Sequence, residues 1–174
     1  MGLSGALDQF FNAARDLSSD PASTVMRGSF LRDSENLAAR FDELSGQLDL
    51  VQSETDEALK SYVNSMNTTF KQLAAVNVQL TKQKSADLQP ADLLDQRDVL
   101  LKDLSGYAHI KTGFAENGAV TVSLGQSLTR DVVVDGLNYF MLGTNFNSAA
   151  PEKVSLVLDP YGNATSLTGV TGGR

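Results

Sequence analysis

Four aspartates between residues 92 and 103 form the densest group of side chains that could do chemistry in this 174-residue chain. They are Asp92, Asp95, Asp98 and Asp103, and members three residues apart on a helix lie near one another. Carboxylates grouped in this way can bind Ca²⁺ or Mg²⁺. A structural interpretation competes, because Asp92 and Asp95 would stabilise a helix start and Asp98 precedes Lys102 by four residues as an ordinary ion pair. We favour the structural interpretation and predict no metal site.

The single histidine, His109, is a second candidate for catalysis. It could act as a general base with Ser105 or Ser123 as nucleophile and Asp103 orienting the imidazole. Neither serine lies in a Gly-x-Ser-x-Gly turn, and the glycine patterns that bind phosphate are absent. One histidine cannot supply a multi-histidine metal site, and without cysteine there is no disulfide, thiolate site or cysteine nucleophile. We therefore predict no catalytic residue, no cofactor and no enzymatic activity.

Composition and charge exclude further classes of protein. The chain is 41% hydrophobic and 20% charged, which is too apolar and too modestly charged for a disordered protein. Its net charge is −7; residues 1–105 contain ten basic and sixteen acidic residues, and residues 106–174 contain four and five. Because no basic stripe is present, we expect no binding to nucleic acid. No apolar run approaches the ~20 residues that a membrane span needs, so we expect no membrane partner.

Composition changes near Gly106, and the two parts predict different secondary structure. Before it, apolar residues recur at helical spacing; from it onward come ten of the fourteen glycines, among alternating Val, Thr, Ser and Leu. This predicts an α+β protein, with an elongated helical, coiled-coil-like domain over residues 1–105 and an antiparallel β-rich domain over residues 106–174. The glycines of residues 171–174 end no obvious element, so we expect the second domain to be truncated.

The first part of the chain predicts a short helix, a long helix and a third helix. Asp20 is expected to cap the long helix with Pro21 in its first turn. No proline follows up to Lys84, so a continuous helix would run about 60 residues, or roughly 90 Å. Gly46 and the polar stretch 52–57 are the places where it could break, which would give two helices in a compact bundle instead. Its apolar residues follow coiled-coil spacing in two runs: Leu37, Phe41, Leu44, Leu48 and Val51, then Leu59, Val63, Met66, Phe70, Leu73 and Leu80.

The third helix is predicted to begin with Asp92 as its cap and to end at Gly106. The glycine-rich part then predicts β-hairpins, with a two-residue turn at Asp135-Gly136. Strands are expected over residues 108–114, 119–124, 131–134, 137–142 and 154–158, with a further turn at 160–163.

Several side chains carry expectations about packing. Arg97 is predicted to form an ion pair between helices. Asn64, Asn67 and Asn77 lie on or beside the second apolar run, where they could fix the register of an interface, but we favour solvent-facing positions. We expect stability to depend on ten apolar residues of the helices: Phe10, Phe11, Leu17, Leu37, Phe41, Leu44, Leu48, Leu94, Leu101 and Leu104.

Two stretches of the chain resemble the flagellar hook-associated protein 1 family, whose members form the junction between the bacterial hook and the filament. The first is Leu7-Asp8-Gln9-Phe10-Phe11-Asn12, continuing through residues 16–23 to Arg27. The second is Asp92-Leu93-Leu94-Asp95-Gln96-Arg97-Asp98 before an apolar helix. The long helix and the glycine-rich region occur in the order expected of the family, so the resemblance covers essentially all 174 residues.

The resemblance implies a structural subunit that joins the hook to the filament. Its partners would be neighbouring copies of itself, the hook protein and the second junction protein. It would lie outside the cell on the flagellum after type III export without a cleaved signal peptide. The family's terminal helices build the inner tube of the flagellum, so this chain is expected to be an internal part, mostly monomeric by itself at micromolar concentration.

Two other functions stay open. A generic coiled-coil spacer or surface adhesin stalk would show stable self-association of the chain alone. A metal-assisted hydrolase using the aspartates would have to bind divalent ions.

Overall fold

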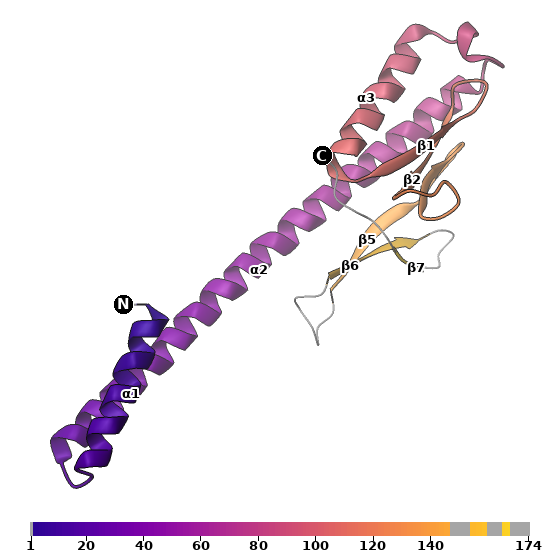
Figure 1. Cartoon of the computed structure of the whole chain (residues 1–174). Helices are drawn as coiled ribbons and strands as arrows, with labels where there is room; N and C mark the ends of the chain where they lie inside the picture. The colour runs from indigo at the N-terminus through magenta and orange to yellow at the C-terminus, as the bar shows by residue number, and fades with distance from the viewer. Residues whose placement is uncertain (1, 147–153, 160–164, 168–174) are drawn as a thin grey trace. The chain divides into compact units, whose positions relative to one another are not determined.

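The computed structural model describes residues 2–146, 154–159 and 165–167 (Figure 1). The chain divides into two compact units, Met1–Thr55 and Asp56–Arg174. Helices come first and antiparallel strands follow, which confirms the predicted α+β class. The turn predicted at 160–163 and the chain end at 171–174 lie outside the described residues, and the domain boundary at residue 106 stays a prediction.

In the first unit, helix α1, Leu3–Ser19, packs on the beginning of helix α2, Thr24–Leu80 (Figure 1). The ring of Phe10 on α1 lies 5.3 Å from the ring of Phe30 on α2, measured between centroids. Ala6 and Ala13 are the buried residues of α1, and their small side chains allow close packing.

The turn between these helices differs from the prediction. The Ser23 hydroxyl accepts a hydrogen bond from the Met26 amide at 3.4 Å, so Ser23 is the residue that caps α2. Asp20 instead ends α1, where its own amide donates to the Asp16 carbonyl oxygen at 3.4 Å. Pro21 lies in the turn before α2, and its carbonyl accepts from Arg27 Nε at 2.8 Å. The predictions for Asp20 and Pro21 were wrong because a serine closer to the helix supplies the cap.

Helix α2 is continuous over 57 residues, which confirms the prediction of one long helix. Neither Gly46 nor the polar stretch 52–57 interrupts it. A glycine inside a helix costs only about 1 kcal/mol relative to alanine, which neighbouring helix-forming residues offset. In the polar stretch the Thr55 hydroxyl donates to the Val51 carbonyl oxygen at 2.7 Å, a bond compatible with unbroken helix. No helix in the described part of the chain is long and apolar enough to span a membrane.

The second unit contains the end of α2, the short 3-10 helix η1, Ala86–Leu88, helix α3, Ala91–Tyr107, and all the described strands. Two predicted bounds of α3 were wrong. Pro90 precedes the helix, so Asp92 lies within the first turn and makes no capping hydrogen bond. Gly106 lies inside the helix, which continues by one residue to Tyr107.

The strands form two antiparallel sheets. The first has the order β1-β2-β3-β4, with bounds Ile110–Phe114, Val120–Leu124, Val132–Asp135 and Asn138–Tyr139. The second has the order β5-β6-β7, with bounds Met141–Phe146, Val154–Asp159 and Thr165–Ser166. The strand expected over residues 137–142 is therefore divided between the two sheets.

The hairpin predicted near Asp135 is present, but its loop lies one residue later. Asp135 pairs with Asn138, which leaves Gly136 and Leu137 as the loop. Gly136 has φ +57° whereas Leu137 is not among the residues with positive φ, the pattern of a type II′ turn.

The core of the second unit combines α2, α3 and the strands. Phe70, Leu73 and Leu104 are fully buried, and they share one apolar cluster with the inward-facing strand residues Val120, Val122, Leu124, Val133, Val134, Leu142 and Leu158. The second apolar run of α2, except Leu80, supplies the helix side of this core. Its coiled-coil spacing predicted that helices would cover this face, whereas strands cover it together with α3.

The list of residues expected to carry stability was wrong for four members. Phe11, Phe41, Leu44 and Leu48 are exposed at 59%, 52%, 37% and 69%. Leu104 is fully buried, and the other five are half-buried: Phe10, Leu17, Leu37, Leu94 and Leu101. Periodicity identifies the apolar face of a helix, but it does not show whether anything covers that face.

Candidate functional site

The aspartates considered as metal ligands do not form a site. Asp92, Asp95, Asp98 and Asp103 are all exposed on α3. Among the described residues, no group of three acidic or histidine side chains is placed to hold a metal ion. The ion pair of Asp98 is with Arg97, at 2.7 Å, and not with Lys102 as predicted.

The alternative centred on His109 is not assembled either. His109 is exposed. The hydroxyl of Ser105 donates to the Lys102 carbonyl oxygen at 2.7 Å, and that of Ser123 donates to the Ser127 carbonyl oxygen at 2.5 Å. Both candidate nucleophiles are thus committed to local backbone carbonyls.

The second unit contains a mostly apolar cavity of about 530 Å³. Tyr62 and Tyr107 border it with rings 5.9 Å apart, and the rest of its lining is apolar: Leu59, Val63, Met66, Gly106, Ala108, Leu124, Leu142 and Leu156. Among the described residues, the two tyrosines are the only side chains in this lining that carry a polar hydrogen-bonding group.

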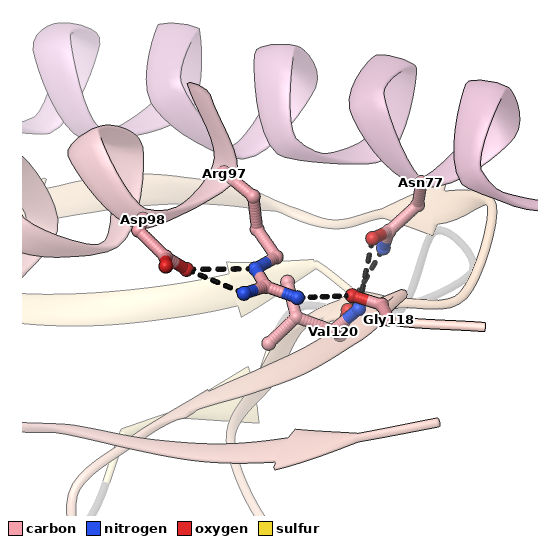
Figure 2. Close-up of polar contacts among 5 residues, drawn as sticks. All are labelled: Asn77, Arg97, Asp98, Gly118 and Val120. Carbon is pink, nitrogen blue, oxygen red and sulfur yellow. Dashed lines mark hydrogen bonds and ion pairs between the residues drawn. The ribbon is translucent and has the colours of Figure 1, made fainter. Parts of the chain in front are cut away.

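The polar groups that the fold does bring together are amides, where α2 contacts the strands. Asn77 is fully buried and its side chain meets the backbone at Val120, the first residue of β2 (Figure 2). Its Oδ1 accepts from the Val120 amide at 2.8 Å, and its Nδ2 donates to the carbonyl oxygens of Val120 at 2.8 Å and Gly136 at 2.6 Å. One side chain therefore makes the pair of bonds that a neighbouring strand would make, just beyond the end of β3.

Asn67 makes an equivalent contact ten residues earlier on α2. Its Oδ1 accepts from the Leu142 amide and its Nδ2 donates to the Leu142 carbonyl oxygen, both at 2.8 Å. Leu142 belongs to β5, the edge strand of the second sheet. The two asparagines thus attach one helix to both sheets, and each satisfies a backbone N–H and C=O that would otherwise be buried without partners.

The expectation that these asparagines face solvent was wrong for Asn67 and Asn77. Asn64 is exposed, as expected. The sequence carried a signal for the two buried ones, because asparagine is a poor helix former and both lie between core residues of the second apolar run. Burying an asparagine side chain removes its amide from water, so hydrogen bonds within the protein must offset that cost.

Arg97 attaches α3 to the turn between β1 and β2. Its Nη1 donates to the Gly118 carbonyl oxygen at 2.7 Å (Figure 2). Its guanidinium also lies 4.8 Å from the centroid of the Phe114 ring. The predicted ion pair between helices was wrong, because its carboxylate partner is Asp98, the next residue on the same helix. The long-range contacts of Arg97 are with a carbonyl and an aromatic ring.

The same turn is also held by the segment after α2. Gln89 Nε2 donates to the carbonyl oxygens of Leu80, at 2.5 Å, and Asn117, at 3.0 Å. Asn77, Gln89 and Arg97 therefore fix one β-turn from three places in the helical segments. This arrangement holds strands in place.

Replacing Arg97 by alanine is expected to lower the free energy of unfolding by about 1–2 kcal/mol, because a charged hydrogen bond and a cation–π contact are lost together. Urea denaturation of the chain measures the change. Lys102→Ala is the matched control, since this exposed residue of the same helix should change stability by less than about 0.5 kcal/mol. Equal stability of the Arg97 variant and the parent would show that these contacts contribute nothing.

Gly118 lies in that turn and has a left-handed backbone conformation, which residues other than glycine rarely adopt. Its φ is +83°, and an added Cβ would lie 3.0 Å from Leu94 Cδ2 and 3.3 Å from Arg97 Nη1. Gly118→Ala is therefore expected to destabilise the chain by about 1–3 kcal/mol. Gly46→Ala is the control: it is helical with nothing within 4 Å of an added Cβ, so a gain of about 0.5–1 kcal/mol is expected. A thermal midpoint that Gly118→Ala leaves unchanged or raises would disprove the strain at Gly118.

Comparison with known proteins agrees with a structural role for this arrangement. The chain is 29% identical to flagellar hook-associated protein 1 of Bacillus subtilis over 166 residues, which is 95% of the chain and 32% of that relative. It is 26% identical to the protein of the same name from Salmonella typhimurium, over 88% of the chain and 28% of that relative. The chain therefore spans about a third of the length of these curated relatives.

A solved structure has the same fold. It is the flagellar hook junction protein FlgK from Burkholderia pseudomallei, which aligns with 99% of this chain at a TM-score of 0.82 and 21% identity, over 31% of its own length. The family model described as the flagellar hook-associated protein FlgK helical domain matches residues 1–174. On this match over its whole length, the chain belongs to the family of the flagellar hook-associated protein FlgK helical domain.

Proposed function

We propose that this chain is part of a structural subunit that joins the hook of the bacterial flagellum to its filament. The observation that carries the proposal is the family match over residues 1–174, together with relatives named flagellar hook-associated protein 1. The role is mechanical and not enzymatic. It is supported by side chains that clamp backbone to backbone, as Asn67 and Asn77 do.

The first unit supports an assembly role through an uncovered apolar face of α2. Phe41, Leu44, Leu48 and Val51 follow 3-4-3 spacing and are exposed at 52%, 37%, 69% and 59%. Such a row has the spacing of a coiled-coil seam, and an exposed apolar row of this kind is typical of a surface that a partner helix covers. We propose that helical partners in the assembled junction do so, drawn from neighbouring copies, the hook protein and the second junction protein.

The second unit supports the transmission of load. Its helices and sheets share one apolar core and are cross-linked by buried hydrogen bonds, so they are expected to move as one body under force. The location that follows from this function is the outside of the cell, on the flagellum, after type III export without a cleaved signal peptide.

The proposal is tested by removing the gene that encodes this segment from the bacterium that carries it. Hooks should remain but bear no filaments, and filament protein should accumulate in the medium, because its attachment site is missing. Restoring the intact gene should restore filaments and swimming. Normal filaments in the deletion strain would overturn the proposal.

Measuring the self-association of the chain distinguishes the junction function from that of a coiled-coil spacer, which would dimerise by itself. By itself the chain is expected to be mostly monomeric at micromolar concentration, because the helices that would cover the exposed apolar row of α2 are present only in the assembly. Light scattering after size exclusion measures the mass. A tight dimer at micromolar concentration would favour the spacer.

A further inference from the structure

Charge is separated between the two helices of the second unit. Residues 58–86 contain four lysines and no acidic residue, although the whole chain has a net charge of −7. Residues 87–103 contain five aspartates against only Arg97 and Lys102. The end of α2 together with the segment that follows it is therefore basic, and α3 is acidic.

In each of the two regions, charged side chains that form no ion pair lie on both sides of one exposed valine. Val78 on α2 is 46% exposed; Lys71 precedes it on the same helix, and Lys82 follows it in the turn after the helix ends at Leu80. On α3, Val99 is 58% exposed and lies between Asp92 and Asp103. We name these two surfaces the basic row, comprising Lys71, Ala75, Val78 and Lys82, and the acidic row, comprising Asp92, Asp95, Val99 and Asp103; all eight residues are exposed.

The two rows have the same spacing with opposite charge. In each, charged residues stand seven positions before and four positions after the valine. In the acidic row, which lies wholly on α3, both offsets keep the side chains on one helix face over a span of about 16 Å. In the basic row Lys71, Ala75 and Val78 share one face of α2, and Lys82 follows in the turn just after the helix, where its amide donates to the Gln79 carbonyl oxygen at 3.2 Å. Lys71 and Lys82 form no ion pair in the described part of the chain, nor do Asp92, Asp95 and Asp103. Each row thus presents an apolar centre with one sign of charge at both ends.

We propose that the basic row of one copy docks on the acidic row of a second copy of this chain, with Val78 against Val99. The inference rests on the proposed function, because it assigns a contact between neighbouring copies in the junction. The occupant is a second copy since every copy carries both complementary halves and so can bind one neighbour through each. Lysines lie on both sides of Val78 and carboxylates on both sides of Val99, so the charges match whether the helices run parallel or antiparallel.

This contact is weak in isolation and acts at the high local concentration of an assembly. Exposed ion pairs contribute little individually, and Lys102 beside Asp103 reduces the negative charge of the acidic row. The chain is therefore expected to be monomeric at micromolar concentration and to associate only near millimolar concentration. In an assembly, neighbouring copies are held close together, so the effective concentration is high enough for this weak contact to form.

Cross-linking between cysteine variants detects the contact directly, since the chain has no cysteine of its own. A submillimolar mixture of Val78→Cys and Val99→Cys is treated with a short bismaleimide. Mixed dimers should exceed by about fivefold those from Val78→Cys with Leu137→Cys, a control at another exposed apolar residue of the unit, and salt should reduce the excess. Equal yields in the two mixtures would overturn the proposal.

Charge reversal tests the pairing of the rows. Lys71→Glu with Lys82→Glu should abolish the cross-link to an unchanged acidic row, and so should Asp92→Lys with Asp103→Lys to an unchanged basic row. Mixing the two double variants should restore it, because the reversed rows are again complementary. Circular dichroism confirms that these exposed substitutions leave the fold intact.

The same variants separate this inference from the proposed function. In the bacterium, each double variant should give filaments that are shorter or that detach more easily from the hook. Filaments that are normal with both double variants would overturn the row contact while leaving the junction function in place. A deletion strain with normal filaments would instead overturn the function itself.

Discussion

Asn77→Ala is expected to destabilise the second unit by about 3–5 kcal/mol, the larger of the asparagine effects. The substitution removes three hydrogen bonds and leaves the amide of Val120 and the carbonyls of Val120 and Gly136 unsatisfied in a buried place. An unsatisfied buried polar group costs about 1–3 kcal/mol, and no other described side chain bonds these atoms. The loss therefore exceeds that of a typical surface substitution.

Urea denaturation followed by tyrosine fluorescence measures this loss in the second unit alone. All four tyrosines of the chain lie at residue 62 or later, and the chain has no tryptophan. Asn64→Ala is the matched control, since the same change at an exposed site on the same helix should alter stability by less than about 0.5 kcal/mol. Asn67→Ala should fall between the two, because two bonds are lost there instead of three. Equal losses at Asn64 and Asn77 would contradict the role given to the buried amide.

Phe70→Ala is expected to cost about 3–5 kcal/mol, because it leaves a cavity in a closely packed core. Phe70 is fully buried on α2 between Met66 and Leu73 in the main apolar cluster. Phe41→Ala provides the comparison at an equivalent position of the first apolar run of the same helix. Phe41 is 52% exposed, so its substitution in the isolated chain should change stability by less than about 0.5 kcal/mol.

Circular dichroism at increasing urea concentration measures both phenylalanine variants, since it reports on helix throughout the chain. If Phe41→Ala were as destabilising as Phe70→Ala, the first apolar run would have to be covered within the isolated chain, contrary to its exposure here. If neither variant mattered, the core assigned to α2 would be wrong.

The order and type of the elements were predictable because they depend on local signals. Pro21 and Pro90 lie just before α2 and α3, helical spacing identified the helices, and alternation marked most strands. The errors occurred where two local signals competed. Ser23 rather than Asp20 caps α2, and Pro90 rather than Asp92 precedes α3.

The candidate site was not predictable in the same way. Arg97 was expected to find a carboxylate on another helix, yet its distant partners are the Gly118 carbonyl and the Phe114 ring. Asn77 was expected to face solvent, although it is buried against Val120. In both cases the partner is a backbone group or a ring more than fifteen residues away along the chain, and no spacing rule connects such positions.

By itself the sequence determined the class of this protein, its long continuous helix, its family resemblance and the improbability of catalysis, because periodicity, composition and motifs are properties of neighbouring residues. Only the tertiary structure decided which apolar face is covered, since Phe41 and Phe70 have the same local pattern and opposite burial. It also decided which polar residues hold the strands, because a hydrogen bond between Asn77 and Val120 exists only once the chain has folded α2 against β2. Burial and long-range pairing are properties of the packed chain, and a linear pattern does not contain them.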